Sequence, residues 1–101
     1  MPNSETRTPP DSEVESLFNL YNAGDFVGAE NFCRNLLKTY PDSALVSNML
    51  GVVFMAQDKP TEALAAYENT VKTNPDYPDV YNNLGILLNS LGQFDEAIDK
   101  F

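Results

Sequence analysis

The amino-acid sequence predicts an all-α fold in which antiparallel helix hairpins stack side by side as a solenoid. Apolar residues recur every three or four positions along most of the chain, which is the spacing of one face of a helix. Short segments with Gly, Asp and Pro interrupt these stripes. Three alanines, Ala29, Ala63 and Ala97, lie 34 residues apart, and a fixed period of this length is typical of helical repeats. No segment shows the strict alternation of a half-buried strand.

The first hairpin is expected to follow a short leader. Residues 1–9 combine Pro with small polar side chains and have little apolar surface to bury, so we expect this leader to be flexible. The next two apolar stripes occupy residues 14–21 and 26–37. Gly24 suits the end of the first helix and Asp25 suits the N-cap of the second, so the chain should turn between the two helices.

The second and third hairpins repeat this arrangement. Apolar stripes over residues 46–54 and 63–71 flank a turn, and Pro60 stands where the first turn of a helix tolerates it. A fifth stripe covers residues 81–91, and a sixth begins at residue 94 and stops at the end of the chain. The sequence therefore predicts six short helices, the last of them cut off.

Glycine and proline recur with the same 34-residue period. Gly51 and Gly85, each preceded by Leu, fall inside helices, where Gly costs about 1 kcal/mol relative to Ala. We expect the backbone of a neighbouring helix to approach closely at both positions and to offset this cost. Pro41 and Pro75 should stop the second helix of each hairpin. The repeat units then span residues 10–43, 44–77 and 78–101, the third being incomplete.

This pattern resembles the tetratricopeptide repeat over about residues 10–101. The third unit follows the family's pattern most closely, at Tyr81, Leu84, Gly85, Gly92, Phe94, Ala97 and Phe101. The second unit matches at Leu50, Gly51, Phe54, Ala63, Tyr67 and Pro75. It departs from the pattern at Ser47, which replaces the first aromatic, and at Thr70, which replaces a usual Ala. The first unit diverges further, with Leu17 in place of Gly and Cys33 in place of an aromatic.

The residue types needed for most catalysis are absent. There is no His and Cys33 is the only Cys, so the chain lacks the usual general base and the common zinc ligand sets. No phosphate-binding loop or dinucleotide fingerprint is present. The paired acids Glu13, Glu15, Asp95 and Glu96 are interpreted as helix N-terminal residues, and Cys33 as a small core residue. We therefore expect a protein that is not an enzyme and that uses no cofactor and no metal.

Charge restricts the classes of partner. Six Lys and Arg against fifteen Asp and Glu give a formal net charge of −9. Such a chain is repelled by phosphate backbones and by anionic membrane surfaces, so neither nucleic acid nor a membrane is an expected partner. No window approaches the roughly 20 apolar residues of a membrane span, and the first ten residues lack the apolar core of a signal peptide. We expect a cytoplasmic protein.

The resemblance implies a right-handed superhelix whose concave face is built from the first helix of each unit. By position, this face would carry Phe18, Tyr21, Asn22, Asn48, Val52, Met55, Asp79, Asn82, Asn83, Ile86 and Asn89, with Val14 and Leu45 beside them. Each apolar member could equally pack against the next helix. The first helices hold no Lys or Arg, so the carboxylate clamp that some family members build on this face is missing. Asn side chains both donate and accept hydrogen bonds, which suits an extended peptide backbone. We expect a non-enzymatic adaptor that binds a neutral to basic protein or peptide segment in this groove.

The unfinished third unit leaves two further hypotheses. Without a following helix, an open apolar surface would be formed by Phe94, Ala97, Ile98 and Phe101. This surface would let the chain self-associate as a repeat scaffold. Alternatively, the chain is the N-terminal, substrate-recruiting part of a longer enzyme, of the glycosyltransferase or sulfotransferase type that the resemblance suggests.

Overall fold

The computed structural model of the chain describes residues 8–92 and folds them into five helices. They are α1 (Asp11–Asn22), α2 (Phe26–Thr39), α3 (Ala44–Ala56), α4 (Pro60–Thr73) and α5 (Pro78–Ser90). No strand occurs within this span, so the prediction of an all-α fold is confirmed. The sixth predicted helix lies outside the described residues, and so do all four residues of the predicted end surface, Phe94, Ala97, Ile98 and Phe101.

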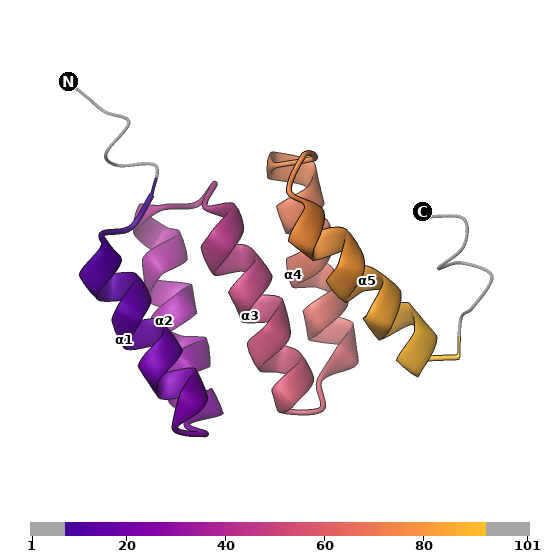
Figure 1. Cartoon of the computed structure of the whole chain (residues 1–101), viewed down its shortest axis with the longest axis horizontal. Coiled ribbons are helices and arrows are strands. Elements are labelled where there is room, and N and C mark those ends of the chain that lie inside the picture. The colour runs from indigo at the N-terminus through magenta and orange to yellow at the C-terminus, as the bar shows by residue number, and fades with distance from the viewer. Residues whose placement is uncertain (1–7, 93–101) are drawn as a thin grey trace.

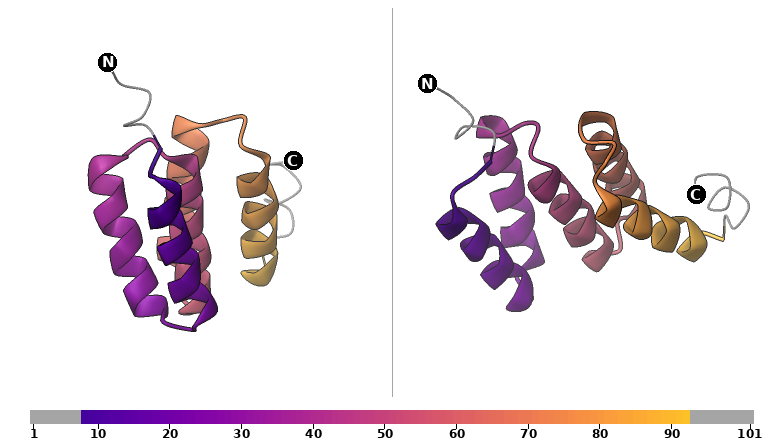
Figure 2. Two further views of the ribbon diagram at one scale, coloured as in Figure 1. Left: turned by 60° about the vertical axis from the view of Figure 1, so that its left-hand side comes forward. Right: turned by 45° about the horizontal axis from the view of Figure 1, so that its top comes forward.

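The helices form two layers. Helices α1, α3 and α5 make one layer, which we call the front layer, and α2 and α4 make the rear layer behind it (Figure 1). The helices follow one another along the array in chain order, each turning back on the one before (Figure 2). The array measures 44 × 31 × 16 Å. Each helix packs on its neighbours in sequence, and α3 also touches α5, which is the spacing of one repeat unit.

The turns between the helices of one hairpin have the same geometry in both complete units. In the first, the N–H of Gly24 donates to the carbonyl of Tyr21 and the N–H of Asp25 donates to that of Leu20, both over 3.0 Å. At the end of α3 the N–H of Asp58 donates to the carbonyl of Met55 over 3.0 Å, and the N–H of Lys59 donates to that of Phe54 over 2.9 Å. These are the two bonds of the Schellman motif, which needs a positive φ at the residue after the cap. The angle is 82° at Gly24, 59° at Asp58 and 76° at Gly92, three residues that lie 34 positions apart.

The starts of α2 and α4 also follow the sequence prediction, which named Asp25 and Pro60. Asp25 caps α2, its Oδ1 accepting a hydrogen bond from the N–H of Gly28 over 2.9 Å. Ser43 caps α3 in the same way through the N–H of Val46. Pro60 lies in the first turn of α4, as predicted. Helices α2 and α4 end two residues before Pro41 and Pro75, because the residue before a Pro avoids the helical region.

The core lies between the two layers and continues from one unit to the next. Its buried apolar residues include Leu17, Ala29, Cys33, Val46, Val53, Phe54, Ala63, Tyr67, Val80, Leu84 and Leu87. Gly51 is also buried, but the expected approach of a helix backbone is wrong at this position. The space that a side chain there would need is filled by the ring of Tyr67 from α4. For Gly85 the close approach stays a prediction.

Candidate interaction surface

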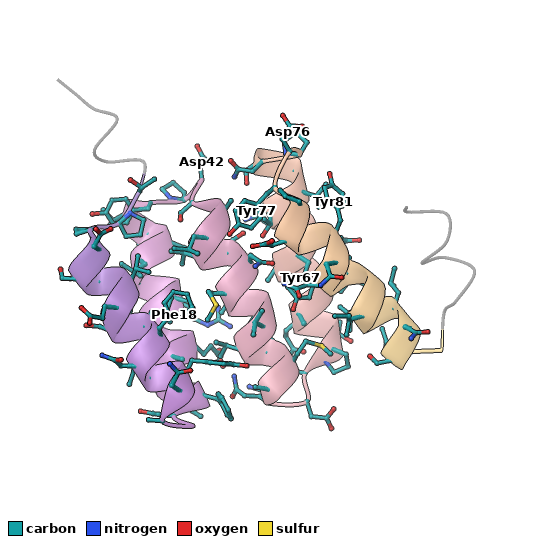
Figure 3. All side chains as sticks on the ribbon, viewed as in Figure 1. Phe18, Asp42, Tyr67, Asp76, Tyr77 and Tyr81 are labelled. Carbon is teal, nitrogen blue, oxygen red and sulfur yellow. The ribbon has the colours of Figure 1, made fainter. Side chains whose placement is uncertain are left out.

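The front layer presents most of the sequence-predicted binding residues to solvent. Asn22 on α1 and the α5 residues Asp79, Asn82 and Asn89 are exposed. Two apolar side chains stand among them, Phe18 on α1 with 36% exposure and Ile86 on α5 with 58%. Figure 3 shows the position of Phe18 half-way along α1. The front layer therefore exposes amides together with single apolar side chains.

Three of the predicted residues serve the core as well as the surface. Tyr21, Val52 and Met55 are half-buried and pack against the core. The ring of Tyr21 meets that of Phe26 in a tilted arrangement with 5.4 Å between centroids. Only the exposed part of these side chains can take part in binding.

Asn48 and Asn83 are bonded to each other. Asn48 on α3 is buried, and its Oδ1 accepts a hydrogen bond from Nδ2 of Asn83 on α5 over 3.0 Å. These two residues lie 35 positions apart, one in the second unit and one in the third. Their amides therefore connect neighbouring units, and Asn82 and Asn89 are the exposed amides of α5.

A cleft of about 710 Å³ opens where α1 and α3 begin and α4 ends. Val14 and Leu45, which were placed beside the predicted face, line it together with Ala44. Two carboxylates, from Asp11 and Asp42, also line it. The remaining lining comes from Thr8, Pro9, Ser43, Thr73, Asn74 and Tyr77.

Sequence reasoning missed the contribution of the turns to this cleft. Asp42 and Asp76 lie 34 positions apart, one in the turn between α2 and α3 and the other in the turn between α4 and α5, and Figure 3 shows both at the same end of the array. The turns are joined by Asn74, whose Nδ2 donates to the carbonyl oxygen of Asp42 over 2.9 Å. Tyr77 directly follows Asp76 in the chain. Burial raises the pKa of the Tyr77 phenol above its ordinary value, and the charge of Asp79 adds to this effect. The signal available in the sequence was this periodic Asp, which shows that the turns are as regular as the helices.

The charge of the two layers differs. The cations among residues 8–92 are Arg34 and Lys38 on α2, Lys59 in the turn after α3, and Lys72 on α4. In the same span the front layer holds no cation, and α1 and α5 carry Asp11, Glu13, Glu15 and Asp79. The front layer is therefore the more acidic side of an acidic chain.

The thiol of Cys33 belongs to the core and not to this surface. Cys33 is buried, and burial raises the pKa of its thiol to about 12, with the carboxylate of Glu30 adding to the effect. Residues 8–92 hold no group of three His, Cys, Asp or Glu side chains placed to bind a metal ion. None of the helices in that range is long and apolar enough to span a bilayer.

The fold and this surface define a helical-hairpin repeat protein with a solvent-exposed front layer. The family model for the tetratricopeptide repeat matches residues 19–68 and again residues 48–101. The chain belongs to the tetratricopeptide repeat family, as the sequence pattern predicted. Repeats of this family generally mediate interactions between proteins and are generally not enzymes.

Proposed function

We propose that the chain is an adaptor whose front layer binds a neutral to basic segment of another protein. The observation that carries this proposal is the charge and polarity of that layer. Within the described residues it combines acids with exposed Asn and apolar side chains and has no Lys or Arg. A basic segment is attracted by such a surface, whereas an acidic one is repelled.

The exposed amides suit a segment in extended conformation. Asn82 and Asn89 lie two helical turns apart on α5, and each amide can donate to and accept from a peptide backbone. Ile86 stands between them and can cover an apolar side chain of the segment. At one end of the layer, Asp11 and Asp42 in the cleft provide carboxylates for a Lys or Arg of the same segment.

A peptide array tests this proposal. The full chain is incubated with peptides of about 15 residues that range from acidic to basic, and the retained peptides are measured again with variants. Ile86→Ser and the double variant Asn82→Ala, Asn89→Ala should weaken retention at least fivefold, since all three side chains are exposed. Val27→Ser is the matched control, because Val27 is 64% exposed on α2 in the rear layer.

Two results would reject the proposal. One is an array dominated by acidic peptides. The other is a set of basic peptides whose retention is unchanged by every front-layer substitution.

A further inference from the structure

The rear layer contains a groove that two cations, Arg34 and Lys38, and one acid, Glu62, line. Helices α2 and α4 each pack on α3, and between them lie two adjoining hollows of about 530 and 320 Å³. Arg34, Leu37 and Leu50 line both hollows, so the two form one continuous depression. We call it the rear groove. Its walls are α2 and α4, and its floor is α3.

The floor of the rear groove is apolar. Leu50 and Phe54 of α3 form it, with Ala66 of α4 and the half-buried Leu37 of α2 beside them. Ala65 on α4 is exposed at the opposite wall. Small side chains on the α4 wall leave the depression open. An apolar floor of this kind gains free energy when another apolar surface covers it.

The α2 wall provides two cations. Arg34 and Lys38 line the groove, and they are half of the cations among residues 8–92. The Nε of Arg34 donates to Oε2 of Glu30 over 2.9 Å, and its guanidinium lies 5.5 Å from the ring centroid of Phe54. These contacts fix the side chain, yet 54% of it is exposed. Arg34 therefore places an ordered guanidinium at the edge of an apolar depression. A guanidinium in such a position can bind a carboxylate through two hydrogen bonds.

The groove favours a helix as its occupant. The backbone groups of α2, α3 and α4 are used within their own helices, so the walls offer no free edge on which an extended segment could pair. The one hydroxyl on the floor, that of Ser47, is buried and already bonded to Thr70. The amides of Asn31, Asn35 and Asn69 lie on the helical walls and not on the floor. A helix satisfies its own backbone and can lay an apolar face between two parallel walls.

We propose that the rear groove binds an amphipathic helix of a partner protein that carries carboxylates along one edge of its apolar face. The apolar face covers Leu37, Leu50 and Ala65, and the carboxylates meet Arg34 and Lys38. This site is separate from the front layer and has the opposite charge preference, so both can be occupied at once. The carboxylates of the partner lie along the α2 wall, because the α4 wall carries Glu62. At physiological ionic strength the Debye length is about 8 Å, so the two cations of the α2 wall act on that edge more strongly than the distant acids of the chain do.

Two synthetic helical peptides test the proposal by fluorescence anisotropy. Both are about 18 residues long with the same Leu-rich face; one carries Glu along the edge of that face and the other carries Lys. The full chain should bind the Glu peptide at least tenfold more tightly than the Lys peptide. Lys38→Glu should weaken binding of the Glu peptide at least threefold, whereas Lys72→Glu, the same charge change at an exposed position of α4 outside the groove, should leave it unchanged.

A second pair of variants tests the shape of the groove without changing charge. Ala65→Tyr fills the groove from an exposed position, so it should abolish binding while the chain stays folded by circular dichroism. Ala56→Tyr, at an exposed position on α3, is the matched control and should bind normally.

The proposal is overturned if the Glu peptide fails to bind, if Ala65→Tyr binds it as well as Ala56→Tyr does, or if Lys72→Glu weakens it as much as Lys38→Glu. It is also overturned if Ile86→Ser removes binding, because the peptide would then lie on the front layer. Sedimentation that shows self-association blocked by Ala65→Tyr would identify a second copy of the chain as the occupant and would reject the proposed partner.

Discussion

The hydroxyl of Ser47 on α3 donates a hydrogen bond to Oγ1 of Thr70 on α4, inside the core. The direction follows from the neighbouring bond, because the single proton of Thr70 goes to the carbonyl oxygen of Ala66 over 3.0 Å. Both side chains are almost completely buried, with 1% and 0% exposure. These are the two positions at which the second unit departs from the family's pattern. The two departures face each other, so a bonded pair of hydroxyls stands at the two positions where the family's pattern has an aromatic and an Ala.

The contributions of the two hydroxyls to stability should depend on each other. Thr70→Val keeps the shape of the side chain but leaves the Ser47 hydroxyl buried without its acceptor, so we expect the free energy of unfolding to fall by about 1 to 3 kcal/mol. Adding Ser47→Ala should recover part of that loss. Urea unfolding of the wild type, the two single variants and the double variant measures the coupling. Losses that simply add would show that the two hydroxyls act independently.

Gly51 should resist replacement even by Ala. The substitution gains about 1 kcal/mol of helix propensity, but the new Cβ would fall within the ring of Tyr67. Overpacking of this kind costs typically 1 to 3 kcal/mol, so we expect a net loss of about 1 kcal/mol in the free energy of unfolding. Thermal unfolding measures it. In a Tyr67→Leu background the same Gly51→Ala change should cost less, and a rise in Tm on the wild-type background would contradict the packing described here.

Sequence reasoning reached the fold because each unit repeats its turn and packing residues with one period. Gly24, Asp25, Pro60 and the periodic Ala each have a local physical reason that does not depend on the rest of the chain. The error at Gly51 has a different cause. The 34-residue period alone indicates that another group packs closely against Gly51. Whether this group is a helix backbone or the ring of Tyr67 depends on the crossing of α3 and α4.

The candidate surface was harder to predict for the same reason. Position within the repeat placed Asn48 on the face, but its amide is buried and accepts from Asn83 of the next unit. No pattern within one unit shows a bond between two units. Likewise, the rear groove depends on the separation of α2 and α4 across α3. The apolar stripe of one helix does not predict how far that helix lies from another.

Replacing Asp58 by Gly should stabilise the folded chain. It holds a φ of 59° after α3, a conformation that costs an L residue roughly 1 kcal/mol, and Gly24 takes the equivalent place after α1. We expect Asp58→Gly to raise the free energy of unfolding by up to about 1 kcal/mol. Gly24→Ala is the mirror experiment: nothing lies within 4 Å of its Cβ, so a loss of about 1 kcal/mol would come from the backbone alone. If Gly24→Ala is neutral, the conformational argument fails at both turns.

The thiol of Cys33 should be unreactive in the folded chain. It is buried, and its pKa of about 12 leaves a negligible fraction of thiolate at pH 8. Reaction with a colorimetric disulfide reagent should be at least a hundredfold slower for the native chain than for the chain in 6 M guanidinium. The residual native rate should follow stability, so the Thr70→Val variant should react faster. A native rate equal to that of the unfolded chain would place the thiol at the surface.

The acid sensitivity of the fold should depend in part on Glu30, which connects α2 to the turn after α3. Its Oε1 accepts from Nε2 of Gln57 over 3.0 Å and lies 3.6 Å from Nζ of Lys59, while Arg34 binds the other oxygen. The bond from Gln57 is the largest cause that lowers the pKa of this carboxyl below 4.5, and the two cations add to it against the opposing effect of burial. The folded chain thus holds this proton more weakly than the unfolded chain. The resulting stability is present above the unfolded pKa and is lost as the pH falls through the folded value.

Glu30→Gln isolates this contribution. At pH 7 the free energy of unfolding of the variant should be about 1 kcal/mol lower than that of the wild type, since the variant loses charge-assisted hydrogen bonds at a partly exposed site. The difference should shrink as the pH falls from 4.5 toward about 3, because the wild-type carboxyl then becomes neutral as well. Glu68→Gln, at an exposed position on α4, serves as the control and should show a smaller difference at pH 7. A gap between wild type and Glu30→Gln that stays constant over this pH range would mean that shape at position 30, and not its charge, stabilises the turn.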